Sequence, residues 1–148
     1  MGRFLVSAVI ALCTALAACE GDQHKEIHGH IHVVVNRDDA LVAPAAQALA
    51  AYQTRALPQI ETALHTARPV GRLRLIEILG QVRHVDTVPL LRHFAVFDPD
   101  PRVRGLAETT LSAWRQAPFP ALAEGAESAV KWIAGQRAQG LGPVVREE

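Results

Sequence analysis

The chain has 148 residues and equal numbers of basic and acidic side chains, 15 Lys and Arg against 15 Asp and Glu. A formal charge of zero argues against a nucleic-acid-binding protein, because such proteins usually carry a surplus of basic side chains that contact phosphates. Hydrophobic residues make up 49% of the sequence, which excludes a disordered polymer and allows a packed core. Aromatic residues make up only 5%, and much of the apolar content is Ala and Leu, which favours packed helices over sheets.

The first residues have the pattern of an export signal. Met1-Gly2-Arg3 is a short, positively charged start, and residues 4–15 are mostly apolar. The run ends in Leu16-Ala17-Ala18-Cys19, which resembles the lipobox of bacterial lipoproteins: a branched apolar residue, two small residues and then an obligatory Cys. The resemblance implies that residues 1–18 are a cleaved lipoprotein signal peptide and that Cys19 becomes the lipid-modified first residue of the mature chain.

The lipoprotein signal predicts where the protein lies. It implies a bacterial cell-envelope protein, anchored in the membrane through Cys19 and facing the periplasm, and Glu20 after that Cys favours the outer membrane over the inner one. Two alternatives remain open. One is plain secretion, although that signal usually ends in an Ala-x-Ala-like site. The other is a retained anchor, although a membrane-spanning helix needs about 20 apolar residues.

Residues 19–43 are interpreted as a flexible, His-containing tether. The segment is polar and mixed, and its only regular part alternates apolar residues with His28, His30 and His32, as in an extended strand. A single strand is not stable alone in water, so we expect a spacer between the membrane and a folded domain.

The histidines of this segment also suggest an alternative function. Imidazole is a good ligand for Zn²⁺, Cu²⁺ and Ni²⁺, and an extended segment would put three imidazoles on one side. The candidate metal ligands are His24, His28, His30 and His32. We expect no resident cofactor, and a metal-binding lipoprotein remains the alternative function.

Helices are predicted from Pro44 onward, and they contain a repeat. Three tetrapeptides share the order apolar residue, Pro, any residue, aliphatic residue: Leu57-Pro58-Gln59-Ile60, Val88-Pro89-Leu90-Leu91 and Phe119-Pro120-Ala121-Leu122. Their prolines recur at a constant interval of 31 residues. Pro is favoured in the first turn of a helix, so each tetrapeptide predicts a helix start. The constant interval favours helical repeats over the alternative, a plain three- or four-helix bundle.

One turn carries a more specific resemblance. The run Asp98-Pro99-Asp100-Pro101-Arg102-Val103-Arg104, followed by Ala107 and Leu111, is similar to the HEAT repeat, particularly its phycobilisome-lyase-type short form. The resemblance implies an all-α fold, a short HEAT-like solenoid over residues 44–139 with a C-terminal tail at 140–148. It also implies structural roles in the repeat for Asp98, Asp100 and Arg104, and the repeated helix starts predict structural roles for Pro58, Pro89 and Pro120.

The mature chain lacks the common patterns of catalytic sites. Ser112 and Ser128 lie outside any Gly-x-Ser-x-Gly elbow, and no Gly-rich phosphate loop is present. We therefore expect a scaffold for protein interaction or assembly rather than an enzyme. Its expected partners are an unidentified protein and, through Cys19, the membrane. Because the second helices of HEAT pairs line the concave side, the candidate partner-binding residues are Arg74, Glu77, Gln81, Arg102, Glu108 and Ser112.

Overall fold

The computed structural model describes residues 21–142, which are mostly helical and contain no strand. The expected all-α fold is confirmed. The predicted signal peptide, Cys19 and residues 143–148 of the predicted C-terminal tail lie outside the described residues. The described helices are a first helical segment at 21–36, then α2 Val42–Tyr52, α3 Leu57–Thr66, α4 Pro69–Val82, α5 Val88–Phe97, α6 Pro101–Trp114 and α7 Pro120–Ala138, with short 3₁₀ turns η1 Gln53–Ala56 and η2 Val85–Thr87 before α3 and α5.

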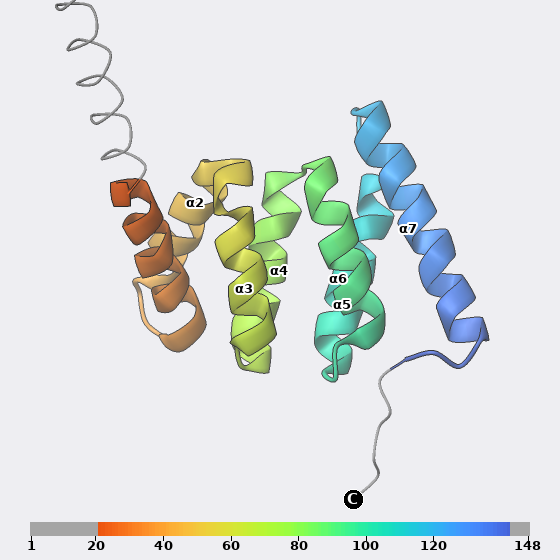
Figure 1. Cartoon of the computed structure of the whole chain (residues 1–148), viewed down its shortest axis with the longest axis horizontal. Coiled ribbons are helices and arrows are strands. Elements are labelled where there is room, and N and C mark those ends of the chain that lie inside the picture. Colours follow the sequence, from red (N-terminus) through yellow and green to blue (C-terminus); the bar gives the residue numbers. More distant parts are fainter. Residues whose placement is uncertain (1–20, 143–148) are drawn as a thin grey trace, which may run out of the picture.

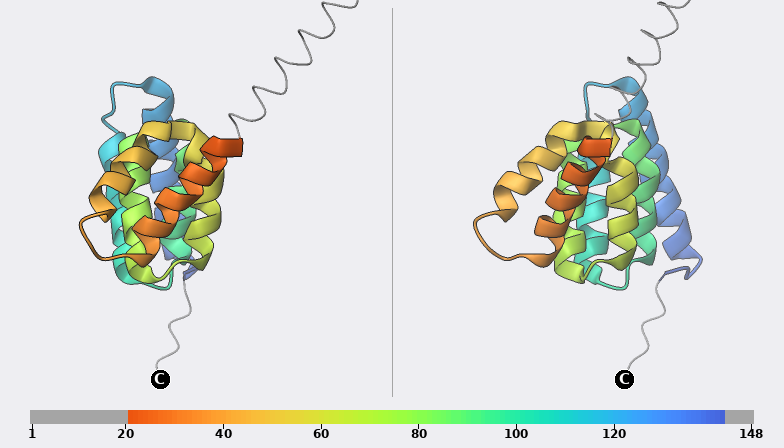
Figure 2. Two further views of the ribbon diagram at one scale, coloured as in Figure 1. Left: turned by 90° about the vertical axis from the view of Figure 1, so that its left-hand side faces the viewer. Right: turned by 60° about the vertical axis from the view of Figure 1, so that its left-hand side comes forward.

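The helices stack in two layers (Figures 1 and 2). One layer contains α2, α4 and α6, and α4 packs against both of its neighbours there. The other layer contains the helical segment 21–36, α3, α5 and α7. Because α7 packs against α5 and α6 together, it covers the C-terminal end of the stack. This arrangement is a short helical-repeat solenoid, as predicted.

One apolar core runs through the whole stack. A helix pair buries only one side by itself, so adjacent pairs must stack to remove their remaining apolar surface from water. The middle helix α4 is buried on most of its sides, because it is covered by both neighbouring pairs. The core side chains that are 0% exposed include Leu49, Ile60, Leu64, Leu75, Leu79, Leu91, Val103 and Leu111.

Local sequence decides where the helices begin. Each of the three repeated prolines lies in the first turn of a helix, in α3, α5 and α7 respectively. Pro69 and Pro101 lie in the first turns of α4 and α6. Pro has no N–H to leave unpaired at this position, and its φ angle is already helical.

The turn between α5 and α6 is closed by its own polar side chains. The carboxylate of Asp100 accepts a hydrogen bond from the Arg102 backbone N–H at 2.8 Å and so caps α6. The Arg102 side chain and this N–H lower the pKa of Asp100 to about 2. From the next turn of α6, Arg104 donates to the carbonyl oxygens of Asp98 and Pro99 at 2.7 and 3.1 Å.

A buried ion pair joins this turn to the preceding repeat. Arg72 of α4 donates from Nε and Nη2 to the two carboxylate oxygens of Asp98 at 2.7 and 3.0 Å. Its Nη1 donates to the carbonyl oxygen of Ala67 in the turn before α4 at 2.7 Å. The side chains of Arg72 and Asp98 are only 12% and 1% exposed. The pair therefore connects the α3–α4 turn to the α5–α6 turn.

The interpretation of residues 19–43 as a flexible, strand-like tether is wrong for the described part. Residues 21–36 are helical, and Ile27, Ile31 and Val34 are 3%, 7% and 0% exposed. Their spacing of four and then three residues is the helical period, which the alternation with His concealed. The segment pairs with α2 and belongs to the solenoid. The solenoid therefore already includes residue 21, whereas the sequence predicted a start at residue 44.

The Arg72–Asp98 pair gives a test of how the repeats are held together. We expect Arg72→Ala to lower the free energy of unfolding by about 3–5 kcal/mol, because it leaves a buried carboxylate without its charge partner. Urea denaturation measures this change. Arg55 in η1 is exposed, so Arg55→Ala should stay within about 0.5 kcal/mol of the unsubstituted protein. A loss below about 1 kcal/mol for Arg72→Ala, the value of a surface ion pair, would contradict a role in joining the repeats.

Candidate functional site

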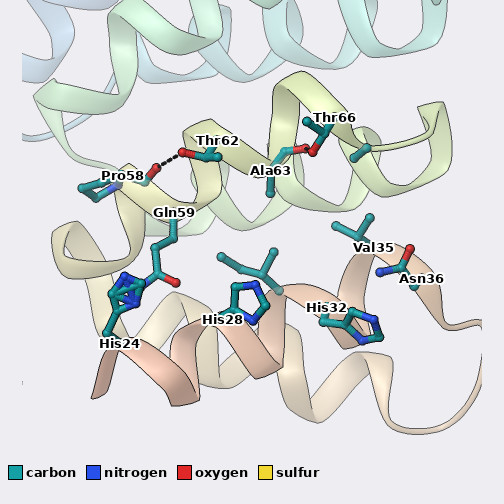
Figure 3. Close-up of a pocket in the computed structure, with 12 residues that line it drawn as sticks. His24, His28, His32, Val35, Asn36, Pro58, Gln59, Thr62, Ala63 and Thr66 are labelled. Atoms are coloured by element: carbon teal, nitrogen blue, oxygen red, sulfur yellow. Dashed lines mark hydrogen bonds between the residues drawn. The ribbon is translucent and has the colours of Figure 1, made fainter. Parts of the chain in front are cut away.

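A groove of about 530 Å³ lies between the helical segment 21–36 and α3 (Figure 3). We call it the N-terminal groove. One wall carries His24, His28 and His32, which follow one another at four-residue intervals on one helix face. The rest of the lining combines an apolar floor with polar side chains of α3 and the end of the first segment: Ile31, Val35, Asn36, Pro58, Gln59, Thr62, Ala63, Thr66 and Ala67.

The polar side chains of α3 differ in how they are satisfied. The hydroxyls of Thr62 and Thr66 donate to carbonyl oxygens of their own helix at 3.0 and 3.3 Å (Figure 3). The amide oxygen Oε1 of Gln59, in contrast, is buried and has no hydrogen-bond partner among the described residues. Gln59 and His24 also line together an adjoining hollow of about 530 Å³. A buried acceptor without a partner costs about 1–3 kcal/mol, so this place favours a donor or a cation.

The structure brings three of the four predicted metal ligands to one face and separates the fourth. The ring centroid of His30 lies 6.4 Å from that of Tyr52, away from the N-terminal groove. The extended geometry that would put His28, His30 and His32 on one side is therefore wrong. Within residues 21–142, no group of three or more His, Cys, Asp or Glu side chains is placed to hold a metal ion.

Arg74, a predicted partner-binding residue, makes several contacts within the fold. Its Nη1 donates to the carbonyl oxygens of Val34 and Arg37 at 3.1 and 2.6 Å, and its Nη2 donates to the carboxylate of Asp38 at 2.7 Å. Arg74 thus satisfies carbonyl groups at the C-terminal end of the first helical segment, where a positive charge is also favourable. Arg74 therefore attaches the first helix pair, and its role in partner binding stays a prediction.

The other predicted partner-binding residues differ in their exposure and in the contacts that they make within the fold. Arg102 pairs with Asp100 at 2.9 Å, and Glu108 accepts two hydrogen bonds from Arg137 of α7 at 3.0 and 2.6 Å. These contacts hold the turn before α6 and the terminal helix in place. The remaining candidates, Glu77, Gln81 and Ser112, are exposed on α4 and α6.

A row of rings crosses the other layer from α3 through α5 to α7, and we call it the aromatic row. The rings of His65, His93, Phe97 and Trp132 follow one another with centroid distances of 6.1, 5.2 and 6.3 Å. The guanidinium of Arg92 lies 4.6 Å from the Trp132 ring centre, and Phe97 is 40% exposed. These four residues do not occupy equivalent positions after the repeated proline of their helix. The repeat spacing in the sequence therefore does not predict the row.

Stacked helix pairs with turn-closing Asp and Arg side chains define an α-helical repeat solenoid. A family model described as HEAT repeats matches residues 57–142, which is more than half of the chain. The protein therefore belongs to the HEAT-repeat family. No curated protein and no solved structure matches the chain at a significant level. The first helical segment and α2 precede the matched region and join it through the shared core.

The contacts of Arg74 lead to a prediction about the first helix pair. We expect Arg74→Ala to lower the free energy of unfolding by about 1.5–3 kcal/mol, the usual value for hydrogen bonds to a charged group. Backbone amides of residues 21–36 should also exchange hydrogen faster. Glu77 is exposed on the same helix, and Glu77→Ala should change stability by no more than about 0.5 kcal/mol. Equally small effects in both variants would mean that Arg74 does not hold this segment.

Proposed function

We propose that this protein is anchored in the bacterial cell envelope by a lipid on Cys19 and binds a protein partner on the periplasmic side. The match to HEAT repeats is the observation that supports binding most directly, because such repeats commonly mediate protein–protein interaction. The sequence Leu16-Ala17-Ala18-Cys19 supports the anchor. The proposal includes no catalytic activity, and Glu20 favours the outer membrane.

Because the chain is helical from residue 21 onward, very little chain separates the proposed anchor from the folded domain. Only Glu20 stands between the proposed lipidated residue and the described helical segment. Two residues of chain reach at most about 7 Å, even when fully extended. A lipid on Cys19 would therefore hold the first helix pair close to the membrane surface.

Two exposed surfaces are available to a protein partner. One consists of Glu77, Gln81 and Ser112 on α4 and α6, and the other is the aromatic row. Aromatic rings and Arg contribute a large share of binding energy at protein interfaces. The aromatic row also crosses three helices, so one partner could contact successive repeats. We therefore place the partner on the aromatic row.

The lipid anchor is tested at Cys19. The Cys19→Ala variant should lose labelling by a palmitate analogue and either leave the membrane fraction or accumulate unprocessed, because the lipid is attached to the Cys sulfur. Cys13→Ala is the matched control and should be labelled like the unsubstituted protein. Labelling that persists in Cys19→Ala would refute the anchor.

The partner surface is tested with two exposed phenylalanines. Phe97 in the aromatic row is 40% exposed, and Phe119, outside the row, is 57% exposed. In cells that express the anchored protein, cross-linking should capture a defined partner. Phe97→Ala should weaken its binding by more than about 1 kcal/mol, as measured with the purified partner, whereas Phe119→Ala should not. Loss of binding in a Glu77→Ala, Gln81→Ala double variant, with normal binding in Phe97→Ala, would assign the surface to α4 and α6 instead.

A further inference from the structure

The N-terminal groove is separate from the aromatic row and has a different chemistry. We propose that His24, His28 and Gln59 form a binding site for one divalent transition-metal ion of the Zn²⁺, Ni²⁺ or Cu²⁺ type. Three observations carry the proposal: the spacing of the imidazoles, the buried amide oxygen opposite them and the shared groove. The site does not depend on the lipid anchor or on the protein partner.

Two imidazoles four residues apart on a helix can bind the same ion. The helix rises about 6 Å over four residues, which leaves room for one ion between side chains that lean toward each other. The two His of the H-E-x-x-H zinc motif use this same spacing. Three His in such a series cannot all reach one ion, because the outer two, His24 and His32, are about 12 Å apart along the helix axis. The ion therefore takes one adjacent pair.

Gln59 selects the pair that contains His24. Its side chain extends from α3 toward His24 and His28 (Figure 3), and its buried Oε1 has no hydrogen-bond partner among the described residues. Gln59 and His24 line both the N-terminal groove and the adjoining hollow, whereas His32 lines only the groove. A bound ion would satisfy this oxygen, so two imidazoles and one amide oxygen form the ligand set.

The charges of the side chains around the site determine how strongly it binds a metal ion. No Asp or Glu is among the described residues that line the groove or the adjoining hollow, and Arg55 lines the hollow. The ion keeps its full charge, and its remaining coordination positions are open to water or to an anionic ligand. Such a site exchanges metal instead of holding it permanently. The fixed positive charge of Arg55 beside the hollow also opposes a cation and so limits the affinity of the site.

Titration of the detergent-solubilised full chain with Zn²⁺ in a calorimeter tests the proposal, and absorption of bound Co²⁺ reports the ligand geometry. We expect saturable 1:1 binding. His24→Gln and His28→Gln should each weaken it at least about tenfold, since even indirect support of a metal ligand is worth that much. His30→Gln is the matched control and should bind like the unsubstituted protein. Gln59→Glu should bind more tightly, because a carboxylate is a stronger zinc ligand than an amide.

Several results would overturn the assignment. Absence of saturable binding would reject the site, and equal weakening by His30→Gln would indicate non-specific binding to the His-rich segment. Loss in His32→Gln with normal binding in His24→Gln would exclude the pair next to Gln59. Circular dichroism of each variant should retain the helical signal, which separates loss of ligands from loss of fold. Cys19→Ala should bind metal normally, so failure of the lipid anchor and failure of this site give different results.

Discussion

The buried Arg72–Asp98 ion pair sets how one repeat sits on the next. Stacked apolar faces tolerate some sliding, because the hydrophobic effect has no direction. A buried carboxylate does not, because leaving it unpaired carries a large penalty. Asp98 also accepts the Asp100 backbone N–H at 2.8 Å, so the turn that starts α6 forms around the same carboxylate. The charge pair thereby links the register between repeats to the geometry within a repeat.

The first helix pair extends the solenoid by other means. Tyr52 of α2 donates a hydrogen bond to Glu26 at 2.7 Å, and this carboxylate raises the pKa of the Tyr52 hydroxyl. Gly71 of α4 permits close approach, because a Cβ at this position would lie 3.1 Å from the Val35 Cγ1. Together with Arg74, these contacts attach residues 21–36 to the repeats. They turn a segment that looks like a spacer into part of the folded domain.

This attachment also separates two possible functions in space. The N-terminal groove uses the side of α3 that faces the first helical segment, whereas the aromatic row begins at His65 on the side that faces α5. A protein partner on the row would leave the groove open. If Cys19 carries a lipid, the groove lies beside the helix that starts two residues after the anchor. Metal exchange and partner binding would then proceed without competing for the same side chains.

The sequence by itself determined the helix starts at Pro58, Pro89 and Pro120 and the repeat class, because these depend on residues close together in the chain. It could not reveal that residues 21–36 are helical, because Ile27, Ile31 and Val33 fit an alternating pattern, whereas Ile27, Ile31 and Val34 fit a helical one. Only packing against the other helices decides between the two. The role of Arg74, the unpaired oxygen of Gln59 and the aromatic row likewise appeared only in the tertiary structure. Each depends on which side chains from different helices come together, and no local spacing encodes which helices become neighbours.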